Sequence, residues 1–405
     1  MEKVKLRIYQ LSLFFTLVAL ALVLVNSGKQ REFFYFGVYA SIIGLLLENK
    51  NVAFRPFSIA YPVLLIGLLN LGWYFAYEYP DKGMNFYNEY LDSSKKIILG
   101  SFLIFYLDRF KVYVSNISFR TAFLLATGLG LIIATGYAFW QASHGAGRVT
   151  MATDRATLSA YVYSVLSLAF VFALFLQAKT VTYLLAGFVI LLSYVTILLT
   201  GTRAAMGLYL ILAVLMTLYH FRKIHIKSAI VFLCVVAALG VISYKPFIKP
   251  KVDQTMREIT QFQQGQDRTS LGARFSMWTV GLQNGLNHPV GQSQENRIEW
   301  TAAYTKTHPH LAASMMYIKV HLHNEFIEKF SLQGIPGIVL LLLFFITLLL
   351  EALKKNNALL LTTTLFLFLY GLTDVILLSS EAVLFFLTLF ALSTYFSRSL
   401  AKQPV

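Results

Sequence analysis

The sequence predicts an all-α integral membrane protein with about twelve transmembrane helices and one large helical outward loop between the ninth and tenth. Three observations lead to this fold class. Over 405 residues the chain is 57% hydrophobic and only 13% charged. Apolar runs of about twenty residues, the length that crosses a bilayer as a helix, recur along the chain. One long segment, residues 245–334, lacks such a run.

The apolar runs give the predicted spans in order. They are residues 9–26, 33–48, 57–76, 97–109, 121–140, 157–177, 180–200, 204–220, 228–244, 335–352, 357–374 and 381–397, of which the fourth is the weakest. The chain therefore divides into a bundle of nine spans at 1–244, a helical loop domain at 245–334, and three spans with a C-terminal tail at 335–405. The first run follows the basic segment MEKVKLR, as in a signal peptide. No small-residue cleavage site follows Val25, so we expect a retained helix.

The distribution of Lys and Arg among the short loops predicts the orientation. With the N-terminus inside, the inward segments hold about twice as many basic residues as the short outward loops, which include Lys95, Lys96 and Arg203. Because basic loops favour the cytoplasm, both termini are expected there, with the loop domain on the opposite side. The single cysteine, Cys234, falls in the ninth predicted span, so the sequence predicts no disulfide framework and no thiolate metal site.

Two amphipathic helices are predicted in the loop domain, on the membrane surface or against the bundle. Apolar residues recur at helical spacing at Val252, Met256, Ile259 and Phe262, and again at Phe275, Trp278, Leu282 and Leu286. The second helix should begin near residues 271–274 and end before Asn287, because Pro289 disfavours a helical residue ahead of it. Arg274 is then expected in its first turn. A cation there opposes the helix dipole, so an anionic ligand would be stabilising.

The last part of the loop domain leads into the tenth span. A short apolar helix is expected in LAASMMYIKV, residues 311–320. It is followed by HLHNEFIEKFSLQGIPG, in which Gly334 and Pro336 open the span. His323 is therefore expected about three helical turns beyond the membrane entry, at the outer surface.

Three motifs share the predicted outward side. Arg203 stands in LLTGTRAAMGLYL at a helix junction, Arg274 opens R-x-x-x-W in a helix followed by HP-x-G, and His323 precedes Gly334 with the spacing H-x10-G. Together with the topology of the whole chain, these motifs resemble the O-antigen ligase and polymerase superfamily. The first family motif is Arg-x-x-x-Leu, whereas here Leu208 lies one position late, which leaves the match at Arg203 less specific than the other two.

The resemblance implies a GT-C-like glycosyltransferase architecture in a bacterial inner membrane, with a periplasmic loop domain and active site. It implies a glycan donor linked to undecaprenyl diphosphate, the lipid A core oligosaccharide as acceptor, and Arg203, Arg274 and His323 as catalytic residues. A polymerase that extends the lipid-linked glycan is the alternative, and the single large outward loop favours the ligase. A transporter is disfavoured because the spans show no two-half repeat and no ionisable residues well inside them.

The residue types suit this chemistry on their own. Arginine binds phosphate through paired charge-assisted hydrogen bonds, although snorkelling to the interface is the alternative for Arg203. Histidine can accept a proton near neutrality, although a surface or capping role is the alternative for His323. The outward segments contain no D-x-D pair. His321 and His323 have a spacing that can ligate a metal ion from an extended segment, but on a helix their side chains would diverge. The sequence therefore predicts a metal-independent reaction without a cofactor.

Other residues are weaker candidates. Arg148, Arg155 and Trp278 are predicted to bind diphosphate or sugar, with solvated loop charges as the alternative for the two arginines. The aromatic run at residues 72–90 is typical of an interfacial belt, with sugar stacking as the alternative. The net charge of +15 fits anionic lipids and substrates as partners, and no nucleic acid is needed to explain it.

Overall fold

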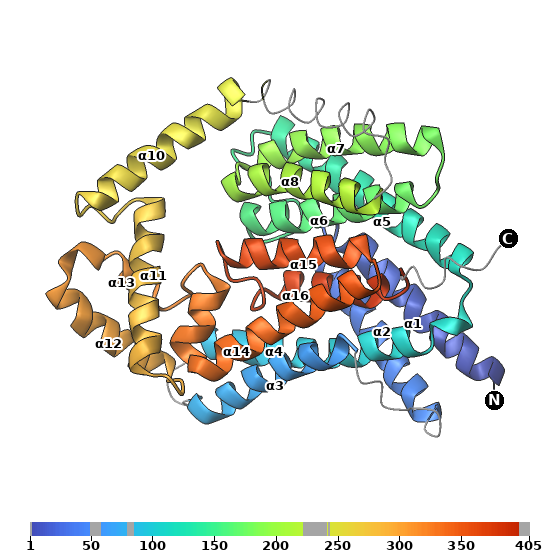
Figure 1. Ribbon diagram of the computed structural model, residues 1–405, viewed down its shortest axis with the longest axis horizontal. Coiled ribbons are helices and arrows are strands. Elements are labelled where there is room, and N and C mark those ends of the chain that lie inside the picture. The colour runs from blue at the N-terminus through green and yellow to red at the C-terminus, as the bar shows by residue number, and fades with distance from the viewer. Residues whose placement is uncertain (1, 49–57, 79–84, 222–240, 242–243, 397–405) are drawn as a thin grey trace.

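The computed structural model describes residues 2–48, 58–78, 85–221, 241 and 244–396, and all regular structure within them is helical (Figure 1). The helices are α1 (Glu2–Leu22), α2 (Ser27–Leu47), α3 (Ala60–Tyr77), α4 (Asn85–Arg109), η1 (Lys111–Tyr113), α5 (Asn116–Ser143), α6 (Ala156–Phe175), α7 (Thr180–Thr200), α8 (Arg203–His220), η2 (Tyr244–Ile248), α10 (Lys249–Gln263), α11 (Ser270–Asn287), α12 (Gln294–Thr307), η3 (Pro309–Leu311), α13 (Ser314–Tyr317), α14 (Glu325–Lys354), α15 (Ala358–Gly371) and α16 (Ser380–Ser393).

Within the described residues, the helices confirm the all-helical class and are consistent with a multi-pass membrane protein. Among the described residues, seven helices are long and apolar enough to cross a bilayer, namely α1, α3, α5, α6, α7, α8 and α14. The apolar helices α15 and α16 are shorter. Each predicted span other than the ninth overlaps a helix. Most of the ninth, at 228–244 with Cys234, lies outside the described residues, and the total of twelve spans stays a prediction.

The centre of the bundle is formed by α6 and α16. Almost every side chain of these two helices is buried, because both are apolar on all sides and other helices surround them. Helix α6 contacts α5, α7 and α15, whereas α16 contacts α1, α2 and α4. Small residues allow close approach at the periphery: a Cβ at Gly130 of α5 would lie 2.7 Å from the backbone oxygen of Ala21.

Helices α10 to α13 lie at one end of the bundle, opposite the N-terminal end of α1 (Figure 1). The two predicted amphipathic helices are confirmed as α10 and α11. Helix α11 begins earlier than expected because the hydroxyl of Thr269 accepts a hydrogen bond from the Gly272 amide at 3.0 Å. Arg274 therefore follows the first turn and does not lie within it. The helix expected at 311–320 is shorter, reduced to α13 after the turn η3.

Helix α14 joins this region to the bundle through a kink at Gly334. The residue adopts φ 60° and ψ −149°, a conformation that only glycine adopts readily. A Cβ at this position would lie 2.2 Å from the carbonyl oxygen of Pro289. The turn after α11 fills the kink, since the Ile335 amide donates to that oxygen at 2.8 Å. The helix starts at Glu325, where Asn324 caps it, and the kink at Gly334 separates this first part from the apolar part that matches the span predicted from residue 335.

Two expectations near α4 are wrong. Lys95 and Lys96, assigned to an outward loop, lie within this helix, and the buried Lys96 pairs with Asp92. In the aromatic run, Trp73 and Tyr90 pack with their ring centroids 4.5 Å apart in a buried cluster between α3 and α4. These buried rings are packing elements and present neither a membrane belt nor a surface for a sugar.

Candidate functional site

His323 and Asp374 form a hydrogen-bonded pair. His323 precedes Asn324, the N-cap of α14, and Asp374 stands in the segment between α15 and α16. The Nδ1 atom of His323 lies 3.0 Å from Oδ1 of Asp374, whose side chain is 6% exposed against 25% for His323. Burial alone would raise the pKa of Asp374, but the hydrogen bond from His323 and the charge of Arg155 lower it to about 2. Asp374 is therefore ionised at neutral pH and can orient the imidazole, leaving Nε2 as the proton acceptor.

The segment that carries His323 is extended and irregular. Residues 321–324 are not helical, so the premise that His321 and His323 diverge is wrong, and their ring centroids lie 4.4 Å apart. His323 has φ 50°, which is uncommon for a residue other than glycine. Its amide donates a long hydrogen bond of 3.4 Å to Nδ1 of His321. Residues held in such conformations concentrate at functional sites.

His321, His323 and Asp374 could together hold a metal ion. One ligand atom from each lies within 4.8 Å of the others. Burial, together with the charges of His323 and Arg155, lowers the pKa of His321 to about 3, so this imidazole is neutral. However, Nη1 of Arg155 lies 3.3 Å from Nε2 of His321. A fixed cation at that distance weakens the affinity of the group for a metal ion.

Arg274 presents a cation to the same region. Its side chain is half-buried, and within the described residues its guanidinium makes no hydrogen bond or ion pair. Arg274 and Arg155 both lie within electrostatic range of the Tyr161 hydroxyl. That hydroxyl lies 3.2 Å from the hydroxyl of Thr373, the neighbour of Asp374. Among the described residues, Arg274 therefore provides a cation without a paired anion in the region of Tyr161 and Thr373.

Arg203, by contrast, is already paired. It is the first residue of α8, after Gly201 ends α7 in the left-handed conformation. Its Nη1 donates to the Thr255 hydroxyl at 3.0 Å, and its Nη2 lies 3.1 Å from Oε1 of Glu258. Burial would raise the pKa of Glu258, but the hydrogen bond from Arg203 lowers it. Glu258 also accepts the Leu271 amide at 3.1 Å, which links Arg203 to the start of α11.

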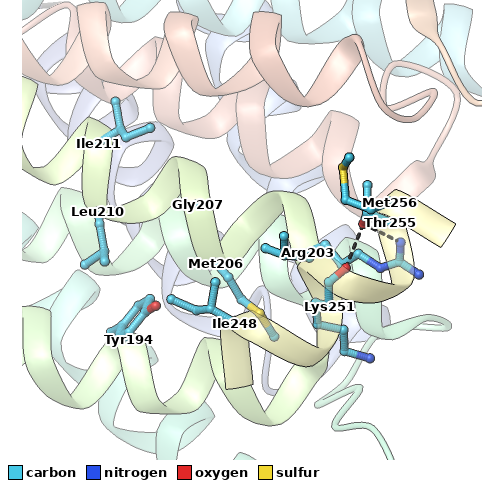
Figure 2. Close-up of a pocket in the computed structure, with 11 residues that line it drawn as sticks. Tyr194, Arg203, Met206, Gly207, Leu210, Ile211, Ile248, Lys251, Thr255 and Met256 are labelled. Carbon is cyan, nitrogen blue, oxygen red and sulfur yellow. Dashed lines mark hydrogen bonds between the residues drawn. The ribbon is translucent and has the colours of Figure 1, made fainter. Parts of the chain in front are cut away.

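Arg203 lines a cavity of about 410 Å³ between α7, α8 and the start of α10. Figure 2 shows Arg203 and Lys251 toward one end of it, with Leu210 and Ile211 toward the other. The remaining lining is mainly apolar: Tyr194, Met206, Gly207, Ile248, Val252, Thr255 and Met256. An apolar cavity with two basic residues at one end suits an anionic lipid.

The three weaker candidates all contact the protein itself. Nε of Arg148 donates to the Thr200 carbonyl at 2.7 Å, so this arginine supports the turn before Arg203. Arg155 contacts His321, as described above. Nε1 of Trp278 donates to the Leu322 carbonyl at 3.1 Å, directly beside His323. Their contribution to substrate binding stays a prediction.

Sequence reasoning missed Asp374 and Glu258. Asp374 fell at the end of the predicted span 357–374, and an ionisable residue within an apolar run is itself a sign of function. Glu258 lies on the amphipathic helix α10, where nothing in the spacing separates it from solvated acids. Both residues meet their partners only through tertiary structure.

Comparison with known proteins supports the resemblance seen in the sequence. Residues 186–342 match the family described as O-Antigen ligase, a segment that contains Arg203, Arg274 and His323. The chain is also 29% identical over 306 residues to the O-antigen ligase of Escherichia coli (strain K12), covering 73% of this chain and 71% of that protein. The predicted resemblance to the O-antigen ligases is therefore confirmed.

Proposed function

Because the chain is related to the O-antigen ligases, we propose that it transfers a glycan from undecaprenyl diphosphate to the lipid A core oligosaccharide on the periplasmic face of the inner membrane. The observation that carries the proposal is the 3.0 Å hydrogen bond between His323 and Asp374. It is supported by Arg274, which has no hydrogen bond or ion pair among the described residues and acts electrostatically on the nearby Tyr161. A proton acceptor and a free cation are what the displacement of a diphosphate requires.

In the proposed reaction, Nε2 of His323 takes the proton from a hydroxyl of the acceptor sugar. The hydroxyl oxygen attacks the anomeric carbon of the donor and forms the new glycosidic bond. The bond from that carbon to the diphosphate oxygen breaks, and its electron pair leaves with the lipid diphosphate. A direct displacement inverts the anomeric configuration. Asp374 stabilises the imidazolium, and such a base contributes roughly 10² to 10⁴ in rate.

Arg274 and Arg203 have the task of stabilising the departing diphosphate. Arg274 has no competing anion among the described residues, whereas Arg203 has to exchange Glu258 for phosphate. The apolar cavity beside Arg203 supports binding of the lipid chain next to the phosphates. Since the two arginines supply the positive charge, the mechanism needs no metal ion.

The test is glycan transfer by the purified protein in liposomes that contain EDTA, the lipid-diphosphate-linked glycan and rough lipopolysaccharide. Wild type is compared with His323→Ala, and with Arg257→Ala as a control at an exposed arginine of α10. Capped lipopolysaccharide that depends on His323 supports the ligase. Elongation of the lipid-linked glycan alone would identify a polymerase, and full activity of His323→Ala would refute the assigned base.

A further inference from the structure

Side chains at the start of α14 form hydrogen bonds with the backbone next to His323 and next to Asp374. Asn324 donates from Nδ2 to the Leu372 carbonyl at 3.0 Å. Glu325 accepts through Oε2 from the amides of Ile376 and Leu377 at 2.8 and 2.9 Å. Together these bonds attach the segment that carries Asp374 to the start of the helix.

The same turn also holds the segment that carries His323. Oε2 of Glu328 accepts the Leu322 amide at 2.8 Å, and its Oε1 pairs with Arg297 at 2.9 Å. Arg297 in turn donates to the Ile318 carbonyl at 3.0 Å. Glu328 therefore helps to hold the chain on the N-terminal side of His323, together with the bond from Trp278 to the Leu322 carbonyl.

The three side chains are buried, and burial makes their partners necessary. Asn324, Glu325 and Glu328 are 6%, 1% and 0% exposed. A buried carboxylate is unfavourable unless donors surround it, and here the donors include backbone amides of the two segments. Within the described residues, no backbone hydrogen bond joins residues 321–323 directly to residues 372–379. Besides the His323–Asp374 bond itself, the side chains of this turn thus provide the hydrogen bonds that connect the two segments.

We propose that Asn324, Glu325 and Glu328 are positioning residues, which hold His323 and Asp374 within hydrogen-bonding distance for proton transfer. The role rests on the proposed function, because it matters only if His323 acts as the base. In the proposed reaction, the three residues act through His323 and Asp374 and take no part in bond formation or proton transfer. Their contribution is geometric: a displacement of about 1 Å in a catalytic group can lower a rate by about 10².

Asn324→Ser tests one bond of this arrangement. Serine keeps the helix cap, because its hydroxyl can still accept from the amides of Phe326 and Ile327, but it lacks the donor to Leu372. Asn357→Ser is the matched control. Asn357 caps α15 in the same way and donates to the Ser393 carbonyl at 2.7 Å, at the far end of a 14-residue helix from Asp374.

Asn324→Ser is expected to lower kcat on the order of tenfold to a hundredfold with KM for both substrates unchanged, whereas Asn357→Ser stays within about twofold of wild type. A loss that appears only as less folded protein, with normal kcat for what remains, would overturn the proposal. Equal kcat in the two variants would do the same. An inactive wild type would count against the proposed function instead.

Two variants of Glu325 provide a second test, because one of them keeps the acceptor oxygen and the other removes it. Glu325→Gln retains an oxygen that accepts both amides, and its NH₂ group takes the place of Oε1, which has no partner among the described residues. Glu325→Met has similar length but no acceptor. Glu325→Gln is expected to keep kcat within about threefold of wild type, and Glu325→Met to lose at least about tenfold. Equal activity of these two variants would contradict the proposal.

A measurement without turnover separates position from activity. In a Cys234→Ala chain with His323→Cys and Asp374→Cys, the rate of cross-linking by a short bifunctional thiol reagent reports the distance between the two segments. Adding Asn324→Ser is expected to slow cross-linking severalfold, whereas adding Asn357→Ser should leave the rate unchanged. Unchanged cross-linking with Asn324→Ser would overturn the proposal even if the protein transferred no glycan.

Discussion

The imidazole of His323 and the carboxylate of Asp374 lie 3.0 Å apart, although 51 residues separate them in the chain. Helices α14 and α15 lie between them in sequence, and the pair forms where the two connecting segments meet. A buried acid so placed fixes which ring nitrogen carries the proton. The pair therefore fixes the orientation of the imidazole that we propose as the base.

Asp374→Asn is expected to lower kcat by about 10² or more, because a neutral amide stabilises the imidazolium poorly and can favour the wrong tautomer. Adding this change to His323→Ala should lower the rate no further, since the two residues act as one unit. Steady-state transfer rates of both single variants and the double variant measure this. His310→Ala, at an exposed histidine of the same region, is the control. Additive losses would mean that Asp374 acts independently of His323.

Acid should destabilise the protein in two steps. His321 is neutral in the folded state with a pKa of about 3, below its ordinary 6.5, so its contribution to stability is complete above pH 6.5 and is lost as pH falls toward 3. Asp374, with a pKa of about 2 against an ordinary 3.8, loses its contribution only between those lower values. Thermal unfolding in detergent should therefore depend less on pH between 6.5 and 4 in His321→Asn. An unchanged slope would contradict the assignment.

Chelation and added zinc should affect glycan transfer differently. EDTA is expected to leave transfer unchanged, because the arginines supply the charge at the diphosphate. Excess Zn²⁺ should inhibit, since His321, His323 and Asp374 can ligate it and the base would be occupied. His321→Asn should weaken that inhibition. Loss of activity in EDTA with recovery on adding Zn²⁺ would instead make the group a catalytic metal site.

Removal of either proposed diphosphate-binding arginine should slow the chemical step. Arg274→Ala and Arg203→Ala are expected to lower kcat by about 10² to 10³, the effect of deleting one donor to a developing charge. Lysine at either position should restore activity only in part, because it lacks the planar fork. Arg257→Ala, at an exposed arginine of α10, should have little effect. A similar loss in all three alanine variants would indicate general attraction of anionic lipid only.

Gly334→Ala should destabilise the fold. Its positive φ and the 2.2 Å approach of a Cβ to the Pro289 oxygen together make alanine unfavourable by about 1–3 kcal/mol or more. Gly136→Ala is the matched control, because nothing lies within 4 Å of a Cβ at that helical position. Thermal unfolding in detergent distinguishes the two. Equal melting temperatures would show that the kink relaxes without cost.

The sequence predicts the fold better than the connections within the site. Apolar runs located most helices, since length and hydropathy are local properties. The hydropathy pattern placed Lys96 in a loop, whereas the residue lies within α4. Its pairing with Asp92, one turn away, allows the charge to be buried inside the helix. The cap at Asn324 extended α14 beyond the apolar run, and an apolar window cannot detect that extension.

The sequence predicted the two arginines and the histidine of the candidate site, but not the two acidic residues that pair with Arg203 and His323. Arg203, Arg274 and His323 stand out by motif. Asp374 and Glu258 gain their roles only from partners distant in sequence, at 3.0 and 3.1 Å. The helical assumption for residues 321–324 also hid the contact between the two histidine rings.

For the diphosphate binding that we propose at Arg203, Glu258 makes the event an exchange of anions. Its carboxylate neutralises the guanidinium at 3.1 Å and receives the Leu271 amide, so an arriving phosphate competes with an anion that the protein supplies itself. Free inorganic phosphate gains little from replacing a well-paired carboxylate. A lipid-linked diphosphate gains in addition the burial of its chain in the adjoining apolar cavity. Through this competition, the site would discriminate between the proposed lipid-linked donor and soluble anions.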